Sequence, residues 1–254
     1  MSTLQQRYLA EMGIPVWRLR ARDAAQSTPF EAGADASAAD AARQDGAGPG
    51  PGGHPPAALR ELEAASPDRF DWEQLALAVR DCTRCGLHQG RTQSVFGVGR
   101  RDADLLVIGE APGAEEDRQG EPFVGRAGQL LNAMLKAIGF AREEVYIANI
   151  LKCRPPNNRD PQPSEQSMCT PYVDRQIELI EPKAILALGR IAAQWLLQSD
   201  VPVGRLRGQV RQYGTAGIPL VVTYHPAYLL RSPLAKAKSW QDLCMVRDIV
   251  GRIE

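Results

Sequence analysis

The stretch Leu105-Leu-Val-Ile-Gly-Glu-Ala-Pro-Gly113 decides the fold, because a short apolar run leads directly into a loop rich in glycine and proline. Apolar runs of this length are typical of strands buried on both faces of a parallel sheet. Three more runs of this kind follow along the chain, at residues 145–148, 184–188 and 220–223. The sequence therefore predicts four parallel strands, the first of them at residues 105–108.

Helical periodicity fills the intervals between these runs, at residues 128–138, 164–180 and 191–198. Regular alternation of strands and helices predicts an α/β protein, with a central four-stranded, mainly parallel sheet and helices on both faces. Residues 204–213 precede the last predicted strand, and we expect them to form an antiparallel strand or a loop.

The N-terminal part of the chain differs from the rest in composition. Residues 1–22 contain a short amphipathic segment, which either packs on the core as a helix or binds a protein partner. Residues 23–70 are rich in Ala, Gly and Pro, most strongly over 31–58. Such a stretch buries too little apolar surface to offset the entropy lost on folding, so we predict a disordered linker. Residues 71–254 form the predicted catalytic domain.

Charge and cysteine usage limit the classes of protein that fit. Lys plus Arg and Asp plus Glu both number 30, so net charge does not argue for nucleic-acid or membrane binding. The sequence contains neither a membrane-length apolar run nor a signal peptide, and we expect a cytoplasmic protein without membrane contact. Five cysteines without an export signal favour metal ligation or free thiols over disulfides.

Three polar side chains follow the predicted strands at their carboxyl ends. Glu110 lies in the Gly-Glu-Ala-Pro-Gly loop, Asn149 ends the second strand, and His225 follows the fourth. Each of these residue types is common in ordinary turns and caps. Ligands of open parallel sheets bind at this edge, however, so the coincidence of all three predicts an active site there.

The cysteines form a second constellation. Cys82 and Cys85 make a Cys-x-x-Cys pair, which is a strong local signal for a metal ligand. Cys153 and Cys169 follow much later, and this spacing leaves zinc and an iron–sulfur cluster open as alternatives. His88 would complete a zinc site in place of one cysteine.

Basic residues surround Cys153, which lies four residues after Asn149. A metal centre at Cys153 would fix the loop that leaves the second strand. Lys152, Arg154 and Arg159 flank the cysteine, and they either meet DNA phosphates or belong to an ordinary solvated loop.

Several spaced motifs resemble the type-4 uracil-DNA glycosylases, the iron–sulfur branch of their superfamily, over about Trp72 to Val250. These motifs are Gly-Glu-Ala-Pro-Gly at 109–113, Glu-Pro-Phe-Val-Gly-Arg at 121–126, Asn149, Cys-Arg-Pro-Pro at 153–156 and His225-Pro226. The resemblance implies a three-layer α/β/α sandwich that removes uracil from single- or double-stranded DNA by hydrolysis and starts base excision repair. It also implies a [4Fe–4S] cluster on the four cysteines, Cys82, Cys85, Cys153 and Cys169.

The resemblance also implies roles for single residues in the active site. Phe123 would stack on the flipped base, Asn149 would pair with the uracil edge, and His225 would donate a hydrogen bond to uracil O2. Glu110 would position water and balance the charge of the sugar cation, although its identity alone does not make it a general base. Gly109 and Ala111 would shape the loop around the base.

A segment for prying the base from the duplex is expected directly after His225. The resemblance makes Leu229, Leu230 and Arg231 the candidates for entering the base stack, with Arg231 also able to meet a phosphate. Ala227 departs from the commoner His-Pro-Ser pattern, which removes a hydroxyl that would otherwise contact phosphate. The backbone amides of 125–128, at the start of a predicted helix, offer another phosphate site.

Other classes of protein remain as alternatives. A relative that captures uracil covalently would carry a His-containing insertion after the second strand, and residues 150–180 contain no His. A catalytically silent iron–sulfur protein would bind DNA or shuttle electrons, and a zinc-stabilised binding module is a third possibility. We expect a monomer, since no feature of the sequence requires a second subunit.

Overall fold

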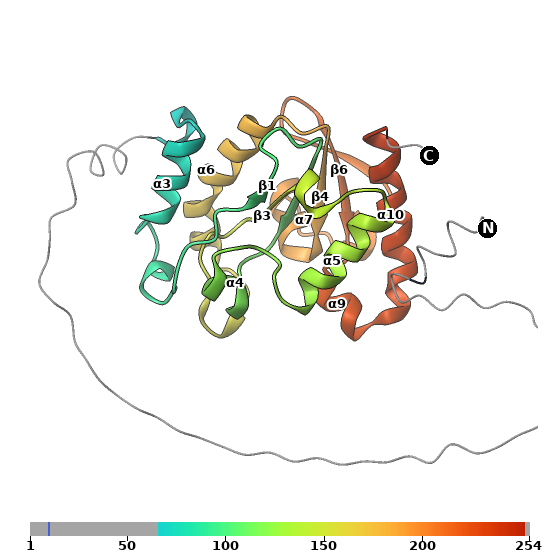
Figure 1. Ribbon diagram of the computed structural model, residues 1–254, viewed down its shortest axis with the longest axis horizontal. Coiled ribbons are helices and arrows are strands. Elements are labelled where there is room, and N and C mark those ends of the chain that lie inside the picture. Colours follow the sequence, from blue (N-terminus) through green and yellow to red (C-terminus); the bar gives the residue numbers. More distant parts are fainter. Residues whose placement is uncertain (1–9, 11–65, 252–254) are drawn as a thin grey trace, which may run out of the picture.

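One mixed sheet of six strands forms the centre of this computed structural model, which describes residue 10 and residues 66–251 (Figure 1). The strand order is β1-β3-β2-β4-β6-β5. The strands are β1 Val98–Gly99, β2 Leu105–Gly109, β3 Tyr146–Asn149, β4 Ala184–Leu188, β5 Val210–Tyr213 and β6 Ile218–Thr223. The predicted amphipathic segment at 1–22 and all but the last five residues of the predicted linker lie outside the described residues, apart from Ala10.

The four predicted strands are the four inner ones, and all their mutual pairings are parallel. The sheet has two strands more than the four predicted, because β1 and β5 add an antiparallel strand at each edge. The strand β1 has two residues, too few to leave a periodic pattern. The strand β5 lies within 204–213, which confirms the antiparallel excursion expected there.

Helices cover both faces of the sheet, which confirms the three-layer α/β/α arrangement. The α-helices are α3 Trp72–Arg80, α4 Ala114–Gln119, α5 Arg126–Ala137, α6 Pro163–Ile180, α7 Gly189–Leu197, α8 Val203–Leu206, α9 Pro226–Arg231 and α10 Lys236–Ile249. Short 3-10 helices lie at η1 Pro67–Arg69, η2 Gly86–Gln89, η3 Arg142–Glu144, η4 Pro156–Asn158 and η5 Pro233–Ala235. Figure 1 shows α3 and α6 on one side of the molecule and α5, α9 and α10 on the other.

Side chains of the inner strands alternate between two cores. In β2, Leu105 and Val107 join the core beneath α5 and α10, whereas Leu106 and Ile108 join the core beneath α6 and α7. This alternation is the two-residue period of a strand, and both of its faces are apolar because helices cover both. No helix among the described residues is long and apolar enough to span a bilayer.

The folded unit begins earlier than residue 71. Pro67 and Phe70 are buried, and Phe70 packs with Leu75, Val79 and Tyr172 in a small core of its own. The predicted linker therefore overlaps the fold at its C-terminal end.

The carboxyl ends of the parallel strands meet at one edge of the sheet. Gly109 pairs with Asn149 in the register of β2 and β3. The contact continues past both strands, since the Ile150 amide donates to the Gly109 carbonyl at 3.0 Å and the Leu151 amide to the Glu110 carbonyl at 3.1 Å. Both exit loops are thereby fixed to each other.

Candidate active site

A cavity of about 510 Å³ opens at this edge of the sheet. Its lining comprises Glu110, Ala111, Gly113, Glu116, Phe123, Ala127, Asn149, Asn158, Asp160, His225, Ala227, Tyr228 and Arg231. The cavity thus brings together six of the residues predicted from the sequence, and its volume lies in the range of small-ligand sites.

Gly109 allows two of these side chains to approach each other. A Cβ atom at Gly109 would lie 2.4 Å from Asn149 Oδ1 and 2.6 Å from Phe123 Cζ. Such distances are well inside van der Waals contact, so any larger residue would displace the ring and the carboxamide. Gly109 is not among the residues that line the cavity, but its lack of a side chain leaves room for the two that do.

Asn149 carries an unpaired acceptor. The residue is 2% exposed, and its Oδ1 has no hydrogen-bond partner among the described residues. A buried polar atom without a partner is costly unless a ligand or water supplies a donor. The position of Asn149 in the cavity wall makes a bound ligand the expected donor.

His225 is held as a neutral hydrogen-bond donor. Its Nδ1 accepts from the Ala227 amide at 3.2 Å, so the proton of the neutral ring resides on Nε2. Burial and the positive charge of Arg231 lower the pKa of His225 to about 4, against the opposing effect of the Glu116 carboxylate. The ring lies beside that of Phe123, with 5.6 Å between centroids.

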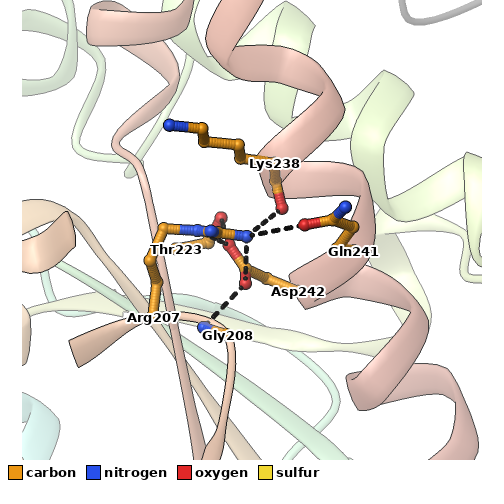
Figure 2. A network of polar contacts seen from close by, with 6 residues as sticks. All are labelled: Arg207, Gly208, Thr223, Lys238, Gln241 and Asp242. Carbon is orange, nitrogen blue, oxygen red and sulfur yellow. Dashed lines mark hydrogen bonds and ion pairs between the residues drawn. The ribbon is translucent and has the colours of Figure 1, made fainter. Parts of the chain in front are cut away.

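A buried polar network anchors the strand that leads to His225 (Figure 2). The Thr223 hydroxyl, at the end of β6, donates to Asp242 Oδ2 at 2.8 Å. Arg207 donates to both oxygens of the same carboxylate, at 2.9 and 2.8 Å, and the Gly208 amide adds a fourth bond at 3.1 Å. Since Thr223 lies two residues before His225, α10 and the segment before β5 together fix the start of the His225 loop.

Glu110 is protonated more readily than an ordinary carboxyl. Burial and, to a smaller extent, the negative charge of Asp160 raise its pKa to about 7, against the opposing charge of Arg190. Arg190 also forms an ion pair with Asp160. The titration of Glu110 thus falls near neutrality.

Leu229 is turned away from the protein surface in this structure. It is fully buried and packs in the core beneath α5 and α10, an arrangement that does not favour its predicted entry into the base stack. The segment after His225 is the helix α9, whose periodicity turns Leu229 inward while Leu230 and Tyr228 stay exposed. Tyr228, which we did not single out from the sequence, lines the cavity with Arg231, three residues on and on the same helical face.

The start of α5 holds a carboxylate of this chain. Glu116 Oε1 accepts from the amides of Val124 at 3.0 Å and Gly125 at 3.2 Å. Of the amides at 125–128 predicted to bind phosphate, that of Gly125 is therefore already bonded within the protein. No local sequence pattern indicates that the Glu116 carboxylate accepts from these two amides.

The four predicted metal-ligating cysteines come from three separate segments. Cys153 and Cys169 are buried in a small apolar cluster, against which Cys85 packs. Burial raises the pKa of the Cys153 thiol, a hydrogen bond from Arg91 at 3.0 Å lowers it, and the charges of Cys85 and Cys82 raise it further. The thiols therefore lie close enough for the charge of one to shift the pKa of another.

The described residues contain no group of three or more His, Cys, Asp or Glu side chains spaced for a metal ion. Cysteine thiolates are nevertheless the ligands that an iron–sulfur cluster takes. His88 Nδ1 lies 2.7 Å from the Cys85 carbonyl oxygen, which gives that ring nitrogen a backbone partner.

Two basic residues near Cys153 have partners within the protein. Lys152 is buried, and its Nζ donates to the carbonyl of Asn149 at 2.9 Å and to Gln176 at 2.6 Å. Arg159 forms two hydrogen bonds to the Glu165 carboxylate. These two side chains hold the loop together and are not available to phosphates in this arrangement.

The fold and the cavity define a class of protein: an α/β/α sandwich with a ligand-sized cavity at the carboxyl edge of its sheet. The model of the uracil DNA glycosylase superfamily matches residues 96–244. A type-4 uracil-DNA glycosylase from Archaeoglobus fulgidus is 41% identical over 186 residues, 71% of this chain and 94% of the relative. One from Thermotoga maritima is 46% identical over 155 residues, 61% of this chain and 80% of the relative.

A more distant relative, a type-5 uracil-DNA glycosylase from Thermus thermophilus, is 34% identical over 118 residues, 41% of this chain and 53% of the relative. The chain belongs to the uracil-DNA glycosylase superfamily and, within it, to the type-4 branch.

Proposed function

We propose that this protein is a monofunctional uracil-DNA glycosylase, which flips uracil out of DNA, hydrolyses its N-glycosidic bond and leaves an abasic site that starts base excision repair. One observation carries the proposal. The same cavity holds an aromatic ring, a carboxamide with an unpaired acceptor and an imidazole fixed as a neutral donor. Membership of the superfamily supports it.

Recognition of uracil falls to Phe123 and Asn149. Stacking on the Phe123 ring contributes about 1–3 kcal/mol and does not discriminate among bases. The Asn149 carboxamide gives N–H to uracil O4 and accepts N3–H at Oδ1, the atom that lacks a partner. Cytosine presents the reverse pattern at these two positions, so it would leave buried polar groups unpaired.

The chemistry requires charge to move from sugar to base. As the C1′–N1 bond breaks, its electron pair leaves with uracil and gathers at O2, where the Nε2–H of His225 donates a hydrogen bond. The sugar becomes an oxocarbenium ion, water adds to C1′ and gives up a proton to solvent, and the uracil anion takes up a proton from solvent as it is released. Glu110, when ionised, stabilises the cation and holds this water. Ala111 lines the cavity, and Gly109 leaves room for Phe123 and Asn149 beside it.

The chemistry of the donor set fits an iron–sulfur centre, with Cys82, Cys85, Cys153 and Cys169 as the residues that would hold a [4Fe–4S] cluster. When bound, this cluster supplies a cross-link between three segments of the chain and takes no part in bond breaking. Cys153 lies two residues beyond Leu151, whose amide holds the Glu110 loop. The cysteines thereby position the active-site edge.

DNA is the proposed partner, in single- or double-stranded form, and the protein acts as a monomer in the cytoplasm. Leu230, exposed on α9, is the remaining leucine that can enter the base stack. Tyr228 and Arg231 line the mouth of the cavity, where they meet the flipped nucleotide and its phosphate.

The test is incubation with a labelled oligonucleotide that carries one uracil, followed by alkali to break abasic sites. We expect cleavage at the uracil, lost in the His225→Ala variant and reduced roughly 100-fold or more in Asn149→Ala, because that variant leaves the base edge unrecognised. Both variants should keep the brown colour of an iron–sulfur cluster.

Two outcomes would contradict the proposal. One is the absence of cleavage by a protein that retains its cluster, which points to a catalytically silent DNA-binding protein. The other is a protein–DNA adduct that survives denaturation, which points to covalent capture of uracil.

A further inference from the structure

Phe123 has a backbone conformation that aromatic residues rarely adopt. Its φ is +55°, in the left-handed region that favours glycine. A non-glycine residue keeps such a conformation only where its surroundings impose it, and these places concentrate at functional sites. The ring at this position is the proposed stacking platform for the base.

Two side chains hold the peptide groups on either side of Phe123. Arg142 donates to the Pro122 carbonyl at 2.6 Å, which fixes the preceding peptide group. It also donates to the Phe123 carbonyl at 3.4 Å, and Glu116 accepts from the Val124 amide at 3.0 Å; these atoms belong to the following peptide group. Because peptide groups are planar, fixing both of them fixes φ and ψ of Phe123.

Missing side chains at two glycines make these contacts possible. A Cβ at Gly128 would lie 1.7 Å from the Phe123 carbonyl oxygen, so only glycine lets α5 pass there. A Cβ at Gly113 would lie 2.7 Å from Glu116 Oε2. The Glu116 carboxylate thus lies against Gly113, where a side chain would crowd it.

We propose that Glu116 and Arg142 are positioning residues, which hold the Phe123 ring in its stacking orientation from opposite sides. This inference rests on the proposed function, in which Phe123 receives the base. Glu116 lines the cavity, yet its Oε1 is bonded to the Val124 and Gly125 amides. Its contribution therefore comes through the backbone of the loop.

The test compares Glu116→Ala with Glu116→Gln in the full chain. Glutamine keeps an acceptor oxygen for the two amides but not the charge, whereas alanine removes the acceptor. Glu115→Ala is the matched control, because Glu115 lies on the same helix and pairs with Arg118 at the surface. Arg142→Met removes the hydrogen bonds to the Pro122 and Phe123 carbonyls.

We expect Glu116→Ala and Arg142→Met to lower the single-turnover rate of uracil release about 10-fold or more and to weaken inhibition by free uracil. Glu116→Gln and the Glu115→Ala control should stay close to the unaltered protein. Hydrogen exchange at the Val124 and Gly125 amides should speed up in Glu116→Ala only. Equal rates, equal inhibition by uracil and equal exchange in the alanine and glutamine variants would overturn the inference.

Uracil release by the unaltered protein tests the proposed function alone. If that release is absent, amide exchange in the variants still decides whether Glu116 holds the loop. Protection of both amides in Glu116→Ala would then refute the positioning role independently of catalysis.

Discussion

Two titratable residues in the cavity have pKa values displaced in opposite senses. Burial lowers the pKa of His225 to about 4 and raises that of Glu110 to about 7. His225 therefore stays neutral across the physiological range, while Glu110 changes charge within it. If ionised Glu110 holds the water, the single-turnover rate should rise as pH rises through about 7.

The stability that Glu110 contributes falls as pH rises, whereas the rate is expected to rise. Its pKa in the folded protein is raised, so its contribution is fully present below the unfolded value of 4.5 and is lost as pH rises through about 7. Rate profiles measured for the unaltered protein and for Glu110→Gln separate these effects. A rising limb that persists unchanged in Glu110→Gln would assign the titration to another group.

Single residues also mark the limit of prediction from sequence. The convergence of Glu110, Asn149 and His225 follows from strand ends alone, because parallel strands place their exits together. Glu116 was not predictable, since its bond partners lie eight and nine residues away and belong to the backbone. Leu229 was assigned by motif position, and its burial depends on the helical conformation of its segment.

At the scale of elements, the network in Figure 2 ties β6 to α10 and to the segment before β5. Asp242 is fully buried, and the Arg207 side chain is 11% exposed. Removing one partner of a buried ion pair leaves an uncompensated charge and costs about 3–5 kcal/mol. We expect Asp242→Ala to lower the free energy of unfolding by about this amount, measured by urea denaturation.

The double variant Asp242→Leu with Arg207→Met is the control for this prediction. It removes both charges together and should be markedly more stable than Asp242→Ala, because no ion is left unpaired. A double variant at least as unstable as Asp242→Ala would show that packing, and not charge, accounts for the effect.

The inner strands were predictable for a physical reason that does not extend to the edges. Strands such as β2 and β4 are buried on both faces and read as continuous apolar runs. By contrast, β1 has two residues and β5 alternates between exposed and half-buried positions, so neither forms an apolar run. The helix α9 follows His225 and starts with Pro226, a residue that fits the first helical turn as well as a loop.

At the scale of the whole molecule, the N-terminal limit of the fold can be tested by truncation. A chain that begins at Ser66 keeps Phe70 and should retain full excision activity and thermal stability. A chain that begins at Asp71 loses the buried Phe70 ring and the bond from Arg175 Nε to its carbonyl, at 2.7 Å. We expect it to lose roughly 3 kcal/mol of stability. Equal melting temperatures would place the boundary after Phe70.

The proposed cluster connects parts of the molecule that are distant in sequence. Cys82 and Cys85 lie between α3 and η2, Cys153 follows β3, and Cys169 lies within α6. A bond network joining these segments restricts the unfolded chain and holds the β3 exit against α6. Cys82→Ala should therefore lower the melting temperature and bleach the cluster's colour.

Cys244 provides the matched control for that variant, since it lies on α10, an element that supplies none of the proposed ligands. Cys244→Ala should keep the colour and nearly all of the stability. If Cys82→Ala instead had the same melting temperature as the unaltered protein, the cross-link would contribute nothing to the stability of the fold. The β3 exit would then depend on Lys152, whose bonds to the Asn149 carbonyl and Gln176 already tie it to α6.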